Sequence, residues 1–111
     1  MTIPKIEFAV VDLDKIVNFL LNPHHPQNGG RAYFFSRFGY TDTDWERMAE
    51  SLIQHAAEGE VVRLERTPYG KKYTVLGDLL APGKRLSDVI SVWIIKPDSP
   101  YPRFVTAHPN N

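Results

Sequence analysis

The first half of the chain repeats its apolar residues at the spacing of an α-helix. Asp12 has the short acidic side chain of an N-cap residue, which accepts a hydrogen bond from the first free backbone N–H groups. The apolar positions that follow recur at helical spacing: Leu13, Ile16, Val17, Leu20 and Leu21. Asn22-Pro23 ends this predicted helix, because the residue before a proline avoids helical backbone angles. A second, short helix with a phenylalanine stripe is expected over residues 31–38, ending at Gly39.

The third predicted helix has the clearest pattern. Thr43 and Glu46 are spaced as a capping box, in which each side chain bonds the backbone N–H of the other. Gly59 is the expected end of the helix. The apolar residues between these limits form one stripe: Trp45, Met48, Ala49, Leu52, Ile53 and Ala56.

Strand patterns occupy the second half of the chain, separated by turns rich in glycine and proline. The expected strands cover residues 60–66, 71–80, 86–96 and 103–108. Gly77 is expected to disturb the second of them. Near the N-terminus, residues 6–11 fit either a short strand or an extended arm.

The order of helices first and strands afterwards predicts an α+β fold. We expect one domain spanning residues 1–111, in which N-terminal helices pack on one face of a four-stranded antiparallel β-sheet. The strand over residues 86–96 is apolar on both faces, whereas an antiparallel strand with one solvated face should alternate. Either the N-terminal arm or a protein partner is therefore expected to cover the second face.

Composition narrows the class of protein. The chain has 13 basic and 13 acidic side chains, so it lacks the positive excess of a general nucleic-acid coat protein. Zero net charge still allows a local cluster of basic residues that binds RNA. The absence of cysteine excludes disulfides, thiol catalysis and cysteine-ligated zinc, and fits a cytoplasmic protein. Acidic residues interrupt the apolar N-terminus from Glu7 onward, so neither a signal peptide nor a membrane span is expected.

The segment between the first two predicted helices concentrates reactive residue types. Histidine titrates near neutral pH, so His24 or His25 could act as a general acid or base; both could equally be exposed loop residues. Gly29, Gly30 and Arg31 follow, where glycine N–H groups and a guanidinium can bind an anion, or where the glycines only permit a tight entry to the helix. Adjacent histidine side chains diverge, so no metal or cofactor is predicted.

Basic residues surround the predicted turn at residues 67–70: Arg63, Arg66, Lys71 and Lys72. Lys72 and Tyr73 are the candidate RNA contacts here, as a phosphate-pairing charge and a base-stacking ring. Two nearby glutamates dilute the positive charge. A solvated sheet edge protected by charge is therefore the simpler interpretation of this strip.

Several segments resemble an uncharacterised bacterial domain family, and the resemblance covers nearly the whole chain. Similar segments occur at the tips of bacterial polymorphic toxins, but no biochemical role comes with the family. The resembling pieces are residues 15–22, His25-Pro26, Gly29-Gly30-Arg31-Ala32, Phe34-Phe35, Phe38-Gly39, Tyr69-Gly70, Tyr73, Trp93 and Val105-Thr106-Ala107-His108-Pro109.

A wider resemblance is to the fold shared by RelE-like toxins, EndoU and certain colicin nucleases. In these proteins helices pack on a four-stranded sheet, and side chains near the helices and on the late strands cleave RNA. This resemblance implies catalytic positions at His25, Arg31, Arg103 and Thr106. Relatives in the narrower family often carry lysine at the position of Arg31. An arginine keeps the positive charge but titrates too high to act as a general base.

The principal hypothesis is a metal-independent RNase toxin domain, or a decayed descendant of one. His25 would move a proton while Arg31 and Arg103 hold the phosphate charge. The expected substrate contacts are Gly29, Gly30, Lys72 and Tyr73. The alternative is a non-enzymatic interaction module, such as an antitoxin-like or regulatory partner, suggested by the strand that is apolar on both faces. A third hypothesis is an anion or small-molecule binder at residues 29–31. The expected partners are RNA and either a protein of toxin–antitoxin type or a second copy of the chain.

Overall fold

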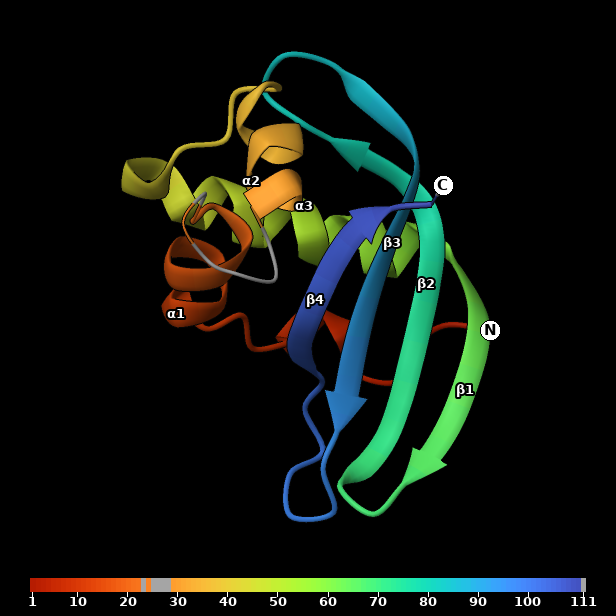
Figure 1. Cartoon of the computed structure of the whole chain (residues 1–111). Coiled ribbons are helices and arrows are strands. Elements are labelled where there is room, and N and C mark those ends of the chain that lie inside the picture. The colour runs from red at the N-terminus through yellow and green to blue at the C-terminus, as the bar shows by residue number, and fades with distance from the viewer. Residues whose placement is uncertain (23, 25–28, 111) are drawn as a thin grey trace.

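A computed structural model of the chain describes residues 1–22, 24 and 29–110, with the backbone alone for residues 29–31 and 33. Helical elements come first and strands follow (Figure 1). The helical elements are η1 (Ile6–Phe8), α1 (Leu13–Lys15), the π-helix η2 (Ile16–Leu20), α2 (Gly29–Ser36), η3 (Asp42–Asp44) and α3 (Trp45–Glu58). The strands are β1 (Glu60–Thr67), β2 (Gly70–Leu80), β3 (Arg85–Ile95) and β4 (Arg103–Pro109). This order confirms the predicted α+β fold.

The strands form one antiparallel sheet in the order β1-β2-β3-β4. The predicted strand limits agree with the observed ones to within one residue. The pairing of β2 with β3 shifts between Gly77 and Leu79, which confirms the predicted disturbance at Gly77. Consecutive strands are neighbours throughout, as expected for strands joined by short turns.

The helices cover one face of this sheet. Rows of directly opposite residues run across the strands, and Tyr73, Trp93 and Phe104 form the central row of the covered face. All three are buried in the hydrophobic core, and the rings of Trp93 and Phe104 meet edge-on with centroids 5.3 Å apart. Helix α3 lies behind the sheet in Figure 1 and supplies Met48 and Leu52 to the same core.

The N-terminal segment lies on the helix side of the sheet, because Ile3 and Ile6 belong to the core (Figure 1). Of the two covers predicted for the second face, the N-terminal arm was therefore wrong, and a protein partner stays a prediction. Residues 6–8 form a turn of 3-10 helix, and Val10 then makes a single parallel bridge to Arg103 at the edge of β4. Among the described residues, no helix lies on the second face, which we call the open face.

The two predicted helix caps were wrong. Asp12 precedes α1 but makes no capping hydrogen bond, because its carboxylate accepts one from Arg103 instead. The capping box of Thr43 and Glu46 does not form. The 3-10 turn η3 moves the start of α3 to Trp45, so Asp44 takes the N-cap position, and Thr43 contacts the hydroxyl of Thr41.

Helix α3 buries a polar group that its apolar stripe did not reveal. The buried face consists of Met48, Ser51, Leu52, His55 and Ala56, and Gly59 follows the helix as predicted. His55 is 2 % exposed and hydrogen-bonded on both ring nitrogens. Nε2 lies 2.8 Å from the carbonyl oxygen of Val89, and because a carbonyl only accepts, Nε2 must carry a proton.

The second nitrogen of His55 completes a buried network with β3. Nδ1 lies 3.0 Å from the hydroxyl oxygen of Ser91, which also accepts a 2.8 Å hydrogen bond from the indole N–H of Trp93. In the neutral imidazole, Nδ1 accepts the hydroxyl proton, so every group is satisfied. Burial lowers the pKa of His55, outweighing the hydrogen bonds to backbone that act in the opposite direction.

Removal of the hydroxyl at the centre of this network should destabilise the domain. Ser91→Ala leaves the Trp93 indole N–H and His55 Nδ1 buried without partners, at a cost of about 1–3 kcal/mol for each unsatisfied group. Ser87→Ala, at an exposed position of the same strand, is the matched control and should shift the free energy of unfolding by less than about 0.5 kcal/mol. Urea denaturation measures both; equal values for the two variants would contradict the network.

The lowered pKa of His55 also predicts a pH dependence of stability. The unfolded chain binds a proton below about pH 6.5, whereas the folded domain resists protonation until the pH falls further. The stabilisation is therefore fully present above about pH 6.5 and is lost as the pH falls toward the folded pKa. In His55→Gln this titration is absent, so the stability gap between wild type and variant should narrow on acidification. A gap that stays constant in urea titrations would contradict this prediction.

Candidate functional site

An irregularity in β4 places two of the sequence-predicted residues on one face. Residues three apart in a regular strand point to opposite faces. Arg103 is opposite Ile94, however, and Thr106 is opposite Val92, because the register shifts and Val105 is the extra residue. Since Ile94 and Val92 are two apart on the regular strand β3, Arg103 and Thr106 share the open face.

The open face gathers further polar side chains around this pair. Lys72 is the β2 neighbour of Ile94, so Lys72 and Arg103 flank the same residue from both sides. Two strand spacings separate their backbones by about 10 Å. His108 is opposite Ile90 and therefore also lies on this face. The structure thus places Lys72, Arg103, Thr106 and His108 on one face, with His108 four positions along β3 from the row of Lys72 and Arg103.

His108 is a candidate that sequence reasoning missed as a proton-transfer group. Its Nδ1 lies 2.9 Å from the carbonyl oxygen of Pro109, which can only accept, so Nδ1 carries the proton. In the neutral ring Nε2 then holds the lone pair and can act as a base. The signal in the sequence was its spacing of two from Thr106, which places both side chains on one face of a strand.

The N-terminal arm positions the side chain of Arg103. Its Nη1 donates a hydrogen bond of 3.0 Å to the carboxylate of Asp12, and backbone bonds to Val10 hold the same strand edge. Both side chains are nearly half exposed, so the ion pair contributes about 1 kcal/mol or less to stability. The ion pair holds the guanidinium beside Asp12. Arg103 also lines a small hollow of about 210 Å³ together with Lys96 and Tyr101.

The remaining predicted residues lie elsewhere. Tyr73 is 5 % exposed and points to the helix side of the sheet, away from its sequence neighbour Lys72. His25 lies outside the described residues. Gly29, Gly30 and Arg31 are the first residues of α2, so the predicted start at Arg31 was two residues late.

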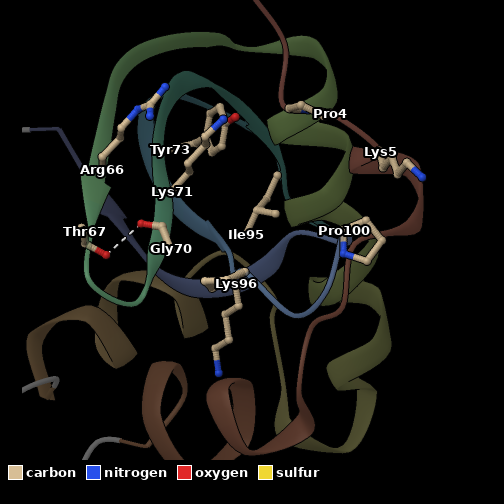
Figure 2. A pocket seen from close by; sticks show the side chains of 11 residues that line it. Pro4, Lys5, Arg66, Thr67, Gly70, Lys71, Tyr73, Ile95, Lys96 and Pro100 are labelled. Carbon is tan, nitrogen blue, oxygen red and sulfur yellow. Dashed lines mark hydrogen bonds between the residues drawn. The ribbon is translucent and has the colours of Figure 1, made fainter.

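Sequence reasoning also missed a cavity of about 500 Å³ at the end of the β1–β2 hairpin, on the helix side of the sheet (Figure 2). We call it the basic pocket. Its charged lining residues are Lys5, Arg66, Lys71 and Lys96. The sequence showed the two hairpin charges, but it gave no indication that the N-terminus and the loop after β3 would join them.

Two other features of the described residues bear on the class of protein. No group of three or more histidine and acidic side chains in the described part of the chain is arranged to hold a metal ion. The described helices are also all too short or too polar to cross a bilayer.

Comparison with known protein families assigns the chain to one of them. A model of the DUF6883 family, a domain of unknown function, matches residues 2–111. The chain belongs to the DUF6883 family. No curated protein matches this DUF6883 domain. The membership confirms the expected resemblance to an uncharacterised domain family.

A solved structure shares the fold of the DUF6883 domain. It is a chain of a contact-dependent growth inhibition toxin–immunity protein complex from Klebsiella pneumoniae 342. The two chains superpose with a TM-score of 0.72 and 23% identity, over 96% of this chain and 97% of the other. The likeness therefore concerns the whole domain, including the sheet that carries the candidate residues.

Proposed function

We propose that this DUF6883 domain is the toxin-type member of a toxin–immunity pair and that it cleaves RNA without a metal ion. The fold shared with a chain of a toxin–immunity complex supports the pairing with a protein partner. The observation that carries the RNA-directed part is that Lys72, Arg103, Thr106 and His108 all lie on the open face. A polymer can reach this face, whereas the core fills the opposite one.

The proposed chemistry is an attack of the ribose 2′-hydroxyl on the adjoining phosphate. The 2′-oxygen forms a bond to phosphorus, and the bond from phosphorus to the 5′-oxygen breaks. One imidazole takes the 2′-hydroxyl proton and another donates a proton to the leaving 5′-oxygen. His25 and His108 are assigned these two roles.

The guanidinium groups would stabilise charge rather than transfer protons. An arginine side chain stays protonated at any physiological pH, so Arg31 and Arg103 would hold the negative charge that grows on the phosphate oxygens. The ion pair with Asp12 would fix the direction in which Arg103 points. The hydroxyl of Thr106 and the ammonium of Lys72 would contact the same stretch of RNA.

One observation favours the alternative of a non-enzymatic immunity-type partner. The open face also carries Ile90, Val92 and Ile94, so β3 is apolar on both faces as the sequence indicated. Such a strip suits a protein interface. The two functions differ in their effect on a host cell, because a toxin arrests growth when expressed alone and an immunity partner does not.

Induction of the domain in a bacterial host should arrest growth and fragment RNA. His25→Ala, His108→Ala and Arg103→Ala should each abolish the arrest and lower RNA cleavage by about 10²–10³-fold, the usual loss when one transition-state contact is removed. Arg85→Ala is the matched control, since Arg85 also pairs with an aspartate at the surface, 3.2 Å away, but lies at the other end of the sheet.

Growth curves measure the arrest and gel analysis of total RNA measures the cleavage. Unfolding curves show that each variant folds. Arrest by all variants alike would remove these residues from catalysis. Harmless expression of the wild type with intact RNA would contradict the toxin role and favour the immunity-type partner.

A further inference from the structure

The basic pocket is built by segments far apart in the chain. Figure 2 shows Arg66 and Lys71 on one side, Pro4 and Pro100 on the other, and Ile95 between them. The pocket lies at the end of the sheet where β1 turns into β2 and where β3 ends.

The turn beside the pocket is held rigidly. The hydroxyl of Thr67 donates a 2.8 Å hydrogen bond to the carbonyl of Gly70 and accepts one from the backbone N–H of Tyr69. Gly70 has a φ of 135°, and a Cβ there would collide with the carbonyl oxygen of Ile95. The close approach of this turn to β3 therefore sets the position of the neighbouring Lys71.

The pairing of Arg66 with Lys71 is electrostatically unfavourable. The two residues are directly opposite on β1 and β2, where side chains of cross-strand neighbours start about 5 Å apart. Like charges at such positions destabilise a sheet. The next pair along the same hairpin, Glu65 and Lys72, has opposite charges and points to the other face. The repulsion is thus confined to the side of the hairpin that lines the pocket.

The ion pairs found among the described residues include none of the four cations of this pocket. The described lining residues of the pocket include no acidic side chain. Lys5 and Lys96 stand at the rim and point outward in Figure 2, and the ammonium of Lys5 lies 5.7 Å from the ring centre of Tyr101. A chain without net charge therefore concentrates four cations at one hollow.

The remaining lining is apolar and suits a ring. Tyr73, Ile95 and Pro100 form part of the wall, and the volume of about 500 Å³ lies in the range of pockets that hold small organic groups. An anionic group joined to a flat ring would satisfy both parts of the lining. A nucleotide unit of single-stranded RNA has this chemistry, with a phosphate for the cations and a base for the apolar wall.

We propose that the basic pocket is a second RNA-binding site, which holds a backbone phosphate between Arg66 and Lys71 and the attached nucleoside against the apolar wall. The inference rests on the proposed function, because it assigns RNA as the ligand. Lys96 lines both this pocket and the hollow at Arg103, so one strand of RNA can contact both sites. The phosphate also removes the repulsion between the two opposed cations.

Lys71→Glu separates binding from folding. It places a carboxylate opposite Arg66, so the melting temperature of the free domain should rise, while affinity for a phosphate should fall at least tenfold. The probe is a fluorescein-labelled single-stranded RNA with 2′-O-methyl groups, which cannot be cleaved, followed by fluorescence anisotropy. Loss of one phosphate contact should lower the slope of log affinity against log salt by about 0.7.

Lys84→Glu is the charge-matched control, at the exposed turn between β2 and β3, the opposite end of the sheet. It should bind the probe as the wild type does. Equal affinities of wild type and Lys71→Glu, no binding of the probe by the wild type, or tighter binding of polyglutamate than of RNA would each overturn the pocket proposal. If the wild type cleaves RNA and Lys71→Glu binds the probe as tightly as the wild type, the pocket proposal alone is refuted. If the wild type binds the probe through Lys71 but does not arrest growth, the toxin role alone is refuted.

Discussion

The row of Tyr73, Trp93 and Phe104 is the contact on which the rest of this structure depends. These three large side chains share one face of the sheet, and burying them against the helices fixes which residues of each strand face inward. A shift of one residue in register would exchange the two faces of a strand. The same row therefore decides that Lys72 faces outward and that Lys71 faces the basic pocket. The extra residue Val105 then turns Thr106 and His108 to the open face. The buried network of His55 and Ser91 lies in the adjoining part of the core.

The basic pocket and the Arg103 end of the open-face site lie toward one end of the sheet, whereas His108 lies four positions farther along β3. The β1–β2 turn, the end of β3 and the start of β4 meet there (Figure 1), so cations from three strands and from the N-terminal segment gather in a chain that has no net charge. The open face offers the groups for chemistry, Arg103 and His108, and the helix side offers the hollow with Arg66 and Lys71. Under the proposed function, this division would separate the positioning of RNA from its cleavage.

The sequence predicted the elements well because their signals are local. Helical periodicity located α3, and runs of strand-forming residues between glycine and proline turns located the four strands. The caps failed because a tertiary contact to Arg103 and a preceding 3-10 turn competed with the local pattern at Asp12 and Thr43. His55 was missed because its partners on β3 lie more than thirty residues away.

The candidate site was less predictable than the fold, and the reasons are physical. Arg103 and Thr106 share a face only because Val105 is an extra residue in β4, and no composition signal marks that irregularity. Lys5 and Lys96 join the hairpin charges through the path of the chain in space, which periodicity does not describe.

The most direct test of the account is a map of RNA contact over the whole domain. Amide chemical shifts would be followed by NMR while an uncleavable single-stranded RNA is added. The account predicts that the largest changes cluster at Lys72, Arg103, Thr106 and His108 and extend through Lys96 to Arg66 and Lys71. Changes confined to the exposed edge of β1 or to the β2–β3 turn, or no changes at all, would contradict it.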